Sequence, residues 1–377
     1  MKRINITLFA IMLVAICFSC THTNLSYTQS GNWVSRATFS GVAMGGGASF
    51  VINDQAYVGT GINPLTPNIK LTTMFRYTYA KILSTPYGYD SAYGSWTQIT
   101  DFPGQARSNA VGFSIGGTTG YIGGGLADDG FTPLNDYYSF NPGTGWSEID
   151  SLVDQNGNSH PRYDAVAFSF DTTAYVLTGT DNYNYFNDIY RYSPTTNSWI
   201  ALPAMPGSKR SAAIEWVYNG KGYLVTGYTN GSKWSSGTQC YDFWYFTPGS
   251  DTDTTSWTRL HDIFNTNAAT FDDGYTNIIR VHGVGFIELA TPIGDKGYVT
   301  LGALNSGDVT FTWEYDFATD LWTEKTPYEG TGRTGSVGFS LQGQTRGFVA
   351  TGLNQGSTAA FSDCEEFFPQ QVYNQYD

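Results

Sequence analysis

Six times along the chain an aromatic residue is followed four positions later by a glycine. The six pairs are Tyr57 and Gly61, Tyr121 and Gly125, Tyr175 and Gly179, Tyr223 and Gly227, Tyr298 and Gly302, and Phe348 and Gly352. Successive pairs lie 48 to 75 residues apart. This period is typical of repeats in which each copy is one small sheet, so the chain is expected to fold as a series of stacked sheets.

Each copy of the repeat contains more than this pair. A second large ring precedes the aromatic residue by seven to twelve positions, and an aromatic strand ending near a tryptophan follows it, as in Asn187 to Trp199. Alternating runs separated by Gly, Asn, Asp and Pro predict a four-stranded meander in each copy. The preceding rings are Phe50, Phe113, Phe168, Trp216, Phe286 and Phe339.

This pattern resembles the Kelch repeat, and the resemblance covers the chain from about residue 31 to its end. The full glycine run of the family is kept at Gly123, Gly124 and Gly125, while the other copies have Thr or Leu before the final glycine. The resemblance implies an all-β β-propeller with four-stranded antiparallel blades, the architecture that galactose oxidase shares, and the six copies predict a six-bladed β-propeller.

The two ends of the repeat region predict how the ring closes. The last copy stops after its third strand, at Asp363 to Phe368, and Trp33 arrives with no strands before it. Trp33 is therefore expected to supply the missing outer strand of the last blade. Such closure would leave no open edge on the ring.

Composition and charge exclude several partners. The 377 residues carry a formal charge of -13, so no basic tract is present to neutralise nucleic-acid phosphates or to dock on anionic lipid. The copper site of galactose oxidase is not expected, because His160, His261 and His282 occupy dissimilar positions in the repeat. Zinc spacing and phosphate loops are also absent, which predicts neither a metal nor another cofactor.

The first twenty residues are a different kind of sequence. Lys2 and Arg3 precede an apolar run from Ile6 to Phe18, which is the order of a secretory signal peptide. The end of this segment resembles a bacterial lipobox, which implies lipidation at Cys20; an ordinary signal peptide cut nearby is the alternative. We therefore expect residues 1–20 to be removed, 21–30 to form a tether, and 31–377 to form a monomeric propeller on the cell envelope, anchored at the outer membrane.

Two cysteines remain in the repeat region, Cys240 and Cys364. Export would permit a disulfide between them. They fall in the third strands of the fourth and sixth copies, which a ring would hold apart, and two unpaired buried thiols are the expected state.

Five copies share an arginine six residues before the first ring, while Met44 holds the equivalent place in the first copy. If these arginines lie at the channel mouth, they would favour a carboxylate-bearing ligand such as an acidic sugar or an acidic peptide. In the alternative, each ties down its own turn by donating to carbonyls, with Asp164 or Glu215 nearby as counter-charge. The five are Arg107, Arg162, Arg210, Arg280 and Arg333.

Loops expected at the same mouth carry Tyr183, Tyr185 and Trp234 among short polar residues. Exposed rings of this kind suit the apolar face of a sugar, although such rings also pack between blades.

The combination favours a non-enzymatic envelope propeller that binds a glycan or an acidic protein segment. The alternative is a carbohydrate enzyme, because secreted bacterial Kelch proteins include sialic-acid mutarotases. Such an enzyme would need an acid/base pair, for which Glu215, His282 and Glu288 are the weak candidates. Burial of Glu215 and Glu288 between blades is the competing interpretation.

Overall fold

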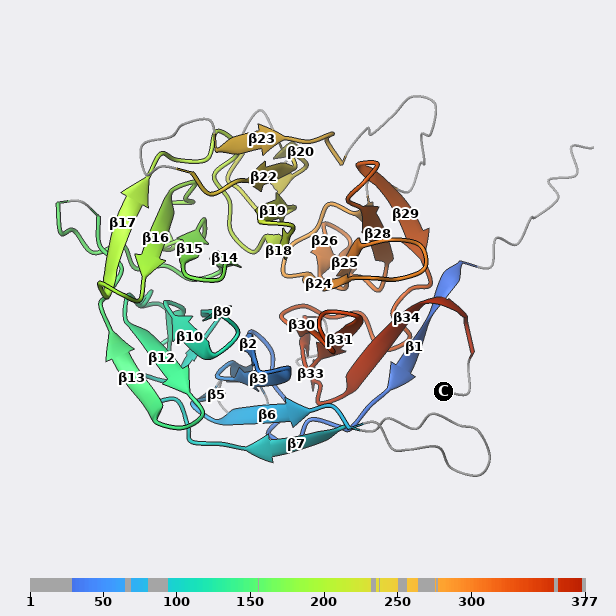
Figure 1. The fold of residues 1–377 in the computed structure, drawn as a ribbon, viewed down its shortest axis with the longest axis horizontal. Coiled ribbons are helices and arrows are strands. Elements are labelled where there is room, and N and C mark those ends of the chain that lie inside the picture. Colours follow the sequence, from blue (N-terminus) through green and yellow to red (C-terminus); the bar gives the residue numbers. More distant parts are fainter. Residues whose placement is uncertain are drawn as a thin grey trace, which may run out of the picture.

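The computed structural model describes residues 29–64, 69–80, 94–154, 156–231, 235–236, 238–249, 256–263, 275, 277–355 and 359–374. Six four-stranded antiparallel sheets stand around a central axis like the blades of a propeller (Figure 1). The described residues form no α-helix, and none of their segments is a helix that could cross a membrane. The predicted all-β, six-bladed architecture is therefore confirmed.

Within each blade the strands follow one another from the axis outwards. The first blade consists of β2 (Ala48–Ile52), β3 (Gln55–Gly59), β6 (Met74–Thr78) and β7 (Ser95–Gln98), and the second of β9 (Val111–Ile115), β10 (Thr119–Gly123), β12 (Tyr137–Asn141) and β13 (Gly145–Ile149). The third blade consists of β14 (Val166–Ser169), β15 (Ala174–Leu177), β16 (Ile189–Ser193) and β17 (Ser198–Leu202), and the fourth of β18 (Ile214–Tyr218), β19 (Lys221–Val225), β22 (Trp244–Phe246) and β23 (Trp257–Arg259). The fifth blade consists of β24 (Val284–Glu288), β25 (Lys296–Thr300), β28 (Thr312–Asp316) and β29 (Leu321–Lys325), and the sixth of β30 (Val337–Leu341), β31 (Arg346–Ala350), β34 (Cys364–Val372) and β1 (Ser30–Ser35).

The two rings of the sequence repeat are directly opposite each other on the first and second strands of every blade. Phe50 faces Tyr57, for example, and their rings stack with centroids 5.2 Å apart. The next blade then packs on this pair: a Cβ added to Gly120 would lie 2.1 Å from the Phe50 ring, so a glycine is needed there. The repeat thus encodes the contacts within a blade and the contacts between blades.

The last blade is completed by the first strand of the chain. β1 pairs with β34, with Trp33 opposite Phe367, and the blue and red strands lie side by side in Figure 1. Trp33 is buried and packs against Phe367, Tyr328 and Phe286 with ring centroids 4.7, 5.1 and 6.1 Å apart. The predicted closure by Trp33 is confirmed.

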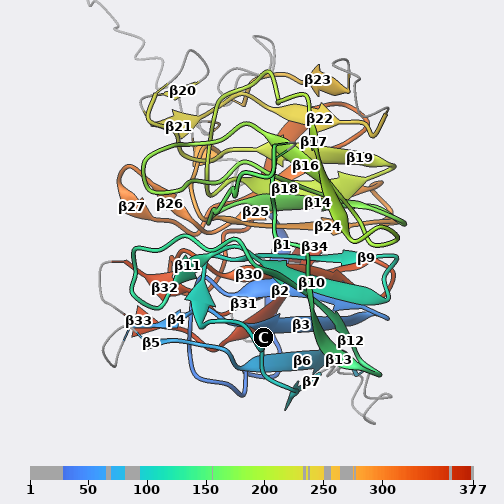
Figure 2. The same ribbon diagram turned by 90° about the vertical axis from the view of Figure 1, so that its left-hand side faces the viewer.

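Five short two-stranded sheets gather at one end of the propeller, which we call the loop face (Figure 2). They lie in the connections that precede the first strands or that join the second and third strands. The sheets are β4 (Ile62–Asn63) with β5 (Ile69–Lys70), β8 (Arg107–Ser108) with β11 (Leu126–Ala127), β20 (Ser235–Ser236) with β21 (Gln239–Cys240), β26 (Ala303–Leu304) with β27 (Gly307–Asp308), and β32 (Leu353–Asn354) with β33 (Ala359–Ala360).

Some sequence predictions fall outside the described residues. The signal peptide, Cys20 and nearly all of the tether belong to residues 1–28, and Trp234 lies in the segment 232–234. Cys240 and Cys364 are described, and both are buried and free, as expected.

Candidate functional site

The five repeated arginines lie inside the blades, not at an opening. Each has a side chain that is at most 1% exposed. Arg162 donates to both carboxylate oxygens of Asp188, at 2.6 and 2.9 Å, and to the carbonyl of Thr178. Equivalent ion pairs join Arg107 to Asp136, Arg210 to Asp242 and Arg333 to Asp363.

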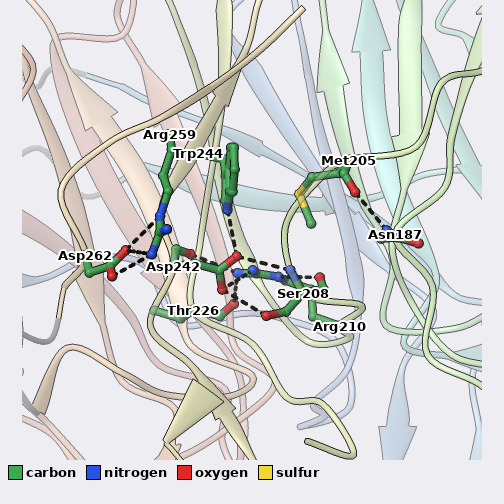
Figure 3. Close-up of polar contacts among 9 residues, drawn as sticks. All are labelled: Asn187, Met205, Ser208, Arg210, Thr226, Asp242, Trp244, Arg259 and Asp262. Carbon is green, nitrogen blue, oxygen red and sulfur yellow. Dashed lines mark hydrogen bonds and ion pairs between the residues drawn. The ribbon is translucent and has the colours of Figure 1, made fainter. Parts of the chain in front are cut away.

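Figure 3 shows the most enclosed of these pairs. Asp242 accepts hydrogen bonds from Arg210, from the Ser208 amide and hydroxyl, and from the Trp244 indole, while Arg210 also donates to the carbonyl of Thr226. Neither member of the Arg210–Asp242 pair is exposed. The guanidinium is therefore fully occupied by its own blade.

Arg280 has no acidic partner of this kind among the described residues, because Phe311 occupies the position that is aspartate in the four other blades with a repeated arginine. Its guanidinium donates to the carbonyls of Ile278, Leu301, Phe311 and Asn277. Burial lowers the pKa of this side chain to about 9.

The repeat glycines explain why the arginines are needed. Gly125 has φ +98° and follows another left-handed residue, so the chain turns sharply at the end of β10. This turn presents the Gly124 carbonyl to Arg107 of the same blade, and the Gly125 amide donates to the carbonyl of Arg162 in the next blade at 2.7 Å. The arginines thus have the turn-fixing role that was considered as the alternative. In four blades the counter-charge is an aspartate just before the third strand, rather than Asp164 or Glu215. The five arginines are buried and do not line the channel mouth, so the prediction that they form a binding rim there is corrected.

Tyr183 and Tyr185 belong to the connection between β15 and β16, on the loop face. Tyr183 is 87% exposed, and Phe131 on the neighbouring loop is 80% exposed. The Asn182 amide donates to the Phe131 carbonyl at 2.6 Å and accepts from the Tyr163 hydroxyl, so the two loop tips are tied together. Tyr185 is instead half-buried and packs against Tyr228, with ring centroids 5.5 Å apart.

A closed ring of backbone hydrogen bonds surrounds the channel at the loop face. One residue from each blade, two positions after the arginine or Met44, has φ between 50° and 62°. The amide of each donates to the carbonyl of the equivalent residue in the preceding blade, at 2.7 to 3.2 Å, and the last bond returns to the first blade. We call these residues the mouth ring: Gly46, Asn109, Asp164, Ala212, His282 and Gly335.

Three members of the mouth ring have functional side chains, and these meet. The side-chain amide of Asn109 donates to one carboxylate oxygen of Asp164 at 2.6 Å, and Nε2 of His282 lies 3.0 Å from the other oxygen. The Asp164 and His282 side chains are 10% and 31% exposed. Burial opposes the charged imidazole, but the neighbouring carboxylate of Asp164 outweighs it and raises the pKa of His282.

Two openings give access to this cluster. One of about 160 Å³ is lined by mouth-ring residues of all six blades, and one of about 270 Å³ extends from Asn109 and His282 toward Pro64 and Asn354. Among the described residues, no lysine or arginine lines either opening. The cluster therefore lies at an opening that a small molecule can enter, and it is the candidate functional site.

The other two proton-carrying candidates lie elsewhere. Glu215 lines the narrow throat below the mouth, at the level where the other blades have Ser49, Gly112, Ala167, Gly285 and Gly338. Burial raises the pKa of Glu215 to about 8. Glu288 is 2% exposed at the blade interface, where it accepts from the Gly347 amide. The structure therefore does not bring Glu288 to the mouth.

Sequence reasoning found His282 but missed its partners. Asn109 went unnoticed, and Asp164 was considered solely as a counter-charge. The signal was present, because all three stand two residues after a repeated arginine. Within the described part of the chain, no group of three or more His, Cys, Asp or Glu side chains is arranged to hold a metal ion.

Comparison with known proteins agrees with the repeat. A Kelch motif matches residues 161–206. The N-acetylneuraminate epimerases of Shigella sonnei (strain Ss046) and Escherichia coli (strain K12) are each 31% identical over 97 residues, covering 22% of this chain and 26% of each relative. The chain thus spans about a quarter of the length of the curated relatives it matches.

The likeness in fold is more extensive than the likeness in sequence. The solved structure of YjhT has a TM-score of 0.63 and 16% identity, and the match covers 87% of this chain and 95% of that chain. The closed ring of six blades and the motif at residues 161–206 show that the chain is a six-bladed β-propeller that contains a Kelch motif.

Proposed function

We propose that this propeller binds a reducing sugar at its loop face and catalyses the opening and closing of the sugar ring, as a mutarotase- or epimerase-like enzyme. The observation that carries the proposal is the contact between His282 and Asp164 at an accessible channel mouth. The sequence similarity to proteins named N-acetylneuraminate epimerase supports the same class of reaction.

The sequence alone favoured binding without catalysis. That interpretation depended on exposed arginines, and the guanidinium groups are buried and hydrogen-bonded within the blades. A histidine and a carboxylate inside the mouth are the feature that distinguishes an enzyme from a simple binding module.

Ring opening requires two proton transfers. Nε2 of His282 is buried and faces Asp164, so the protonated imidazole would donate the proton of its other nitrogen, Nδ1, to the ring oxygen as the bond from that oxygen to the anomeric carbon breaks. Asp164 accepts the proton of the anomeric hydroxyl. A carbonyl forms on the open sugar, and rotation exposes its other face. Closure reverses both transfers and restores the two side chains, so no other reactant is consumed. Asn109 positions Asp164 through its 2.6 Å hydrogen bond.

The aromatic loop tips supply the other property that a sugar site needs. Phe131 and Tyr183 are exposed on adjacent loops of the same face, and Asn182 fixes their relative position. Exposed rings can stack on the apolar face of a pyranose. They would hold the sugar while its anomeric end reaches the mouth.

The test is the rate at which pure anomers of reducing sugars, including N-acetylneuraminate, equilibrate with and without the protein, followed by NMR or polarimetry. His282→Gln and Asp164→Asn should each lower the catalysed rate by about 10²-fold or more. His160→Gln is the matched control, because His160 lies 3.5 Å from Asp154 on the same face but outside the mouth. It should leave the rate unchanged.

The pH profile provides a second readout. Because the pKa of His282 is raised, the catalysed rate should fall as the pH rises through that value, where the imidazole loses its proton. Binding of sugars without any acceleration would leave a binding module and refute the catalytic proposal.

We also propose, from residues 1–20, that the protein is exported and lipid-anchored through Cys20 in the cell envelope, where it acts as a monomer.

A further inference from the structure

The charges at the mouth restrict which sugars fit the proposed site. Among the described residues lining the two openings, the titratable side chains are Asp164 and His282, and they neutralise each other when the imidazole is protonated. The lining supplies no cationic group that is free to pair with an additional carboxylate.

The nearby arginines cannot fill this gap. Arg107, Arg162, Arg210 and Arg333 each have an aspartate partner within the blade, and Arg280 donates to four carbonyls. Moving any of these guanidinium groups to the mouth would leave a buried carboxylate or several buried carbonyls without a partner, which is strongly unfavourable. Lys209 is exposed on a loop of the same face but lines neither opening.

The loops around the mouth carry fixed negative charges. Asp129 and Asp181 accept amide hydrogen bonds in the turns that hold Phe131 and Tyr183. Hydrogen bonds from Thr132 lower the pKa of Asp129 to about 2, and hydrogen bonds from Asn184 lower the pKa of Asp181. Asp154, on another loop of this face, has its pKa lowered to about 2 by hydrogen bonds from Asn158. These carboxylates are therefore ionised near neutral pH.

We infer that the substrate is a sugar without a carboxylate, and not a sialic or uronic acid; this inference rests on the proposed function. An anionic sugar would approach three ionised aspartates and would lose water from its carboxylate without gaining a cationic partner among the described residues that line the openings. A neutral sugar meets neither obstacle and still offers hydroxyl groups to Asn109 and Asp164. The substrate class would thus differ from the one in the names of the relatives.

Glucose and glucuronate provide a matched test, because they differ only in the group at C6. We expect the protein to accelerate anomer exchange of glucose at least about tenfold more than that of glucuronate. N-acetylmannosamine and N-acetylneuraminate should show the same order. Equal or faster exchange of either acidic sugar would overturn the inference while leaving the proposed function intact.

If the protein does not catalyse anomer exchange, sugar binding still separates the proposed enzymatic function from the inference that the sugar is uncharged. Titration of the protein with the same sugars, followed by NMR, should then still give tighter binding of glucose than of glucuronate, in which case the proposed function alone fails. Tighter binding of glucuronate, or no binding of either sugar, would refute the inference as well.

The loop aspartates give the matching variants. Asp129→Asn and Asp181→Asn each keep an oxygen that can accept the turn hydrogen bonds but remove the charge. The variant that carries both Asp129→Asn and Asp181→Asn should show a smaller preference for glucose over glucuronate. In the unaltered protein, a higher salt concentration should also reduce this preference, because salt screens exposed charges. A preference that stays the same under both changes would contradict the electrostatic basis of the inference.

Discussion

At the scale of single residues, the repeated arginines stabilise the turns from inside each blade. A buried cation is tolerated there because a guanidinium has five N–H donors and the blade supplies a carboxylate and a carbonyl in fixed positions. The pairs differ in their exposure: Asp242 is fully buried, whereas the Asp188 side chain is 28% exposed. Removal of the arginine should therefore have unequal consequences in the two blades.

We predict that Arg210→Met lowers the free energy of unfolding by about 3–5 kcal/mol, because it leaves the carboxylate of Asp242 buried without its cation. Arg162→Met should cost less, since Asp188 can be hydrated. Chemical denaturation measures both values, and Lys209→Ala, at an exposed position, should change stability by less than about 0.5 kcal/mol.

A second substitution tests the cause. Adding Asp242→Asn to Arg210→Met should recover part of the lost stability, because the stranded charge is then removed while the amide oxygen can still accept from Ser208 and Trp244. A double variant that is less stable than Arg210→Met alone would show that the loss comes from packing and not from the charge.

At the scale of secondary-structure elements, β1 closes the ring. It donates and accepts along β34, and it brings Trp33 into a cluster of three other rings and Arg36 to Glu366, an ion pair with both side chains buried. Without β1, the edge of β34 would be unpaired, and a free edge strand is a site of aggregation. The other five blades are each built from one continuous segment, so this blade alone joins the two ends of the chain.

We predict that Trp33→Ala lowers the free energy of unfolding by about 3–5 kcal/mol, as expected for loss of a buried tryptophan. Trp146 is the equivalent tryptophan of the second blade and is half-buried, so Trp146→Ala should cost less. Thermal unfolding followed by circular dichroism compares the two variants. Equal losses of stability in the two variants would indicate that closing the propeller adds nothing to what a packed tryptophan side chain contributes.

At the scale of the whole molecule, the blades are joined by two sets of backbone hydrogen bonds that run around the axis. One set is the mouth ring, and the other links each repeat glycine to the arginine or methionine of the next blade. The channel that they enclose is narrow in its throat, where a cavity of about 190 Å³ is lined mainly by glycine, alanine and small apolar residues. Glu215 is placed in this environment only because all six blades surround it.

This enclosure predicts a specific pH dependence of stability. Burial raises the pKa of Glu215 from 4.5 to about 8, so between these values the folded protein keeps a proton that the unfolded chain releases. Unfolding is therefore favoured as the pH rises through this window, by about 1–3 kcal/mol in total after allowance for water in the channel.

Glu215→Gln should remove this dependence and unfold at a higher temperature than the unaltered protein at pH 8. Glu148→Gln, on an exposed outer strand, is the control and should have no such effect. If the unfolding temperatures of the unaltered protein and of Glu215→Gln changed in parallel between pH 4.5 and 8, Glu215 would not keep its proton in the folded protein.

Much of the fold was readable from the sequence because its determinants are close together in the chain. Phe50 and Tyr57 are seven residues apart and face each other across one hairpin, so their spacing reports the pairing directly. The missing tryptophan strand of the last copy likewise predicted the place of Trp33. The arginines are buried and not exposed at the mouth as expected, because their aspartate partners lie 26 to 32 residues away in the sequence, just before the third strand of each blade.

The sequence by itself therefore determined the number of blades, the position of the second strand in each and the closure of the ring, since these follow from local spacing of rings and glycines. Only the tertiary structure decided which polar side chains reach the channel. Asn109, Asp164 and His282 are far apart in the chain, and they meet because three blades place a left-handed residue at the same height around one axis. The repeat of aromatic residues and glycines fixes the position of these backbone residues along the axis, but it does not fix which side chains each blade places at the mouth.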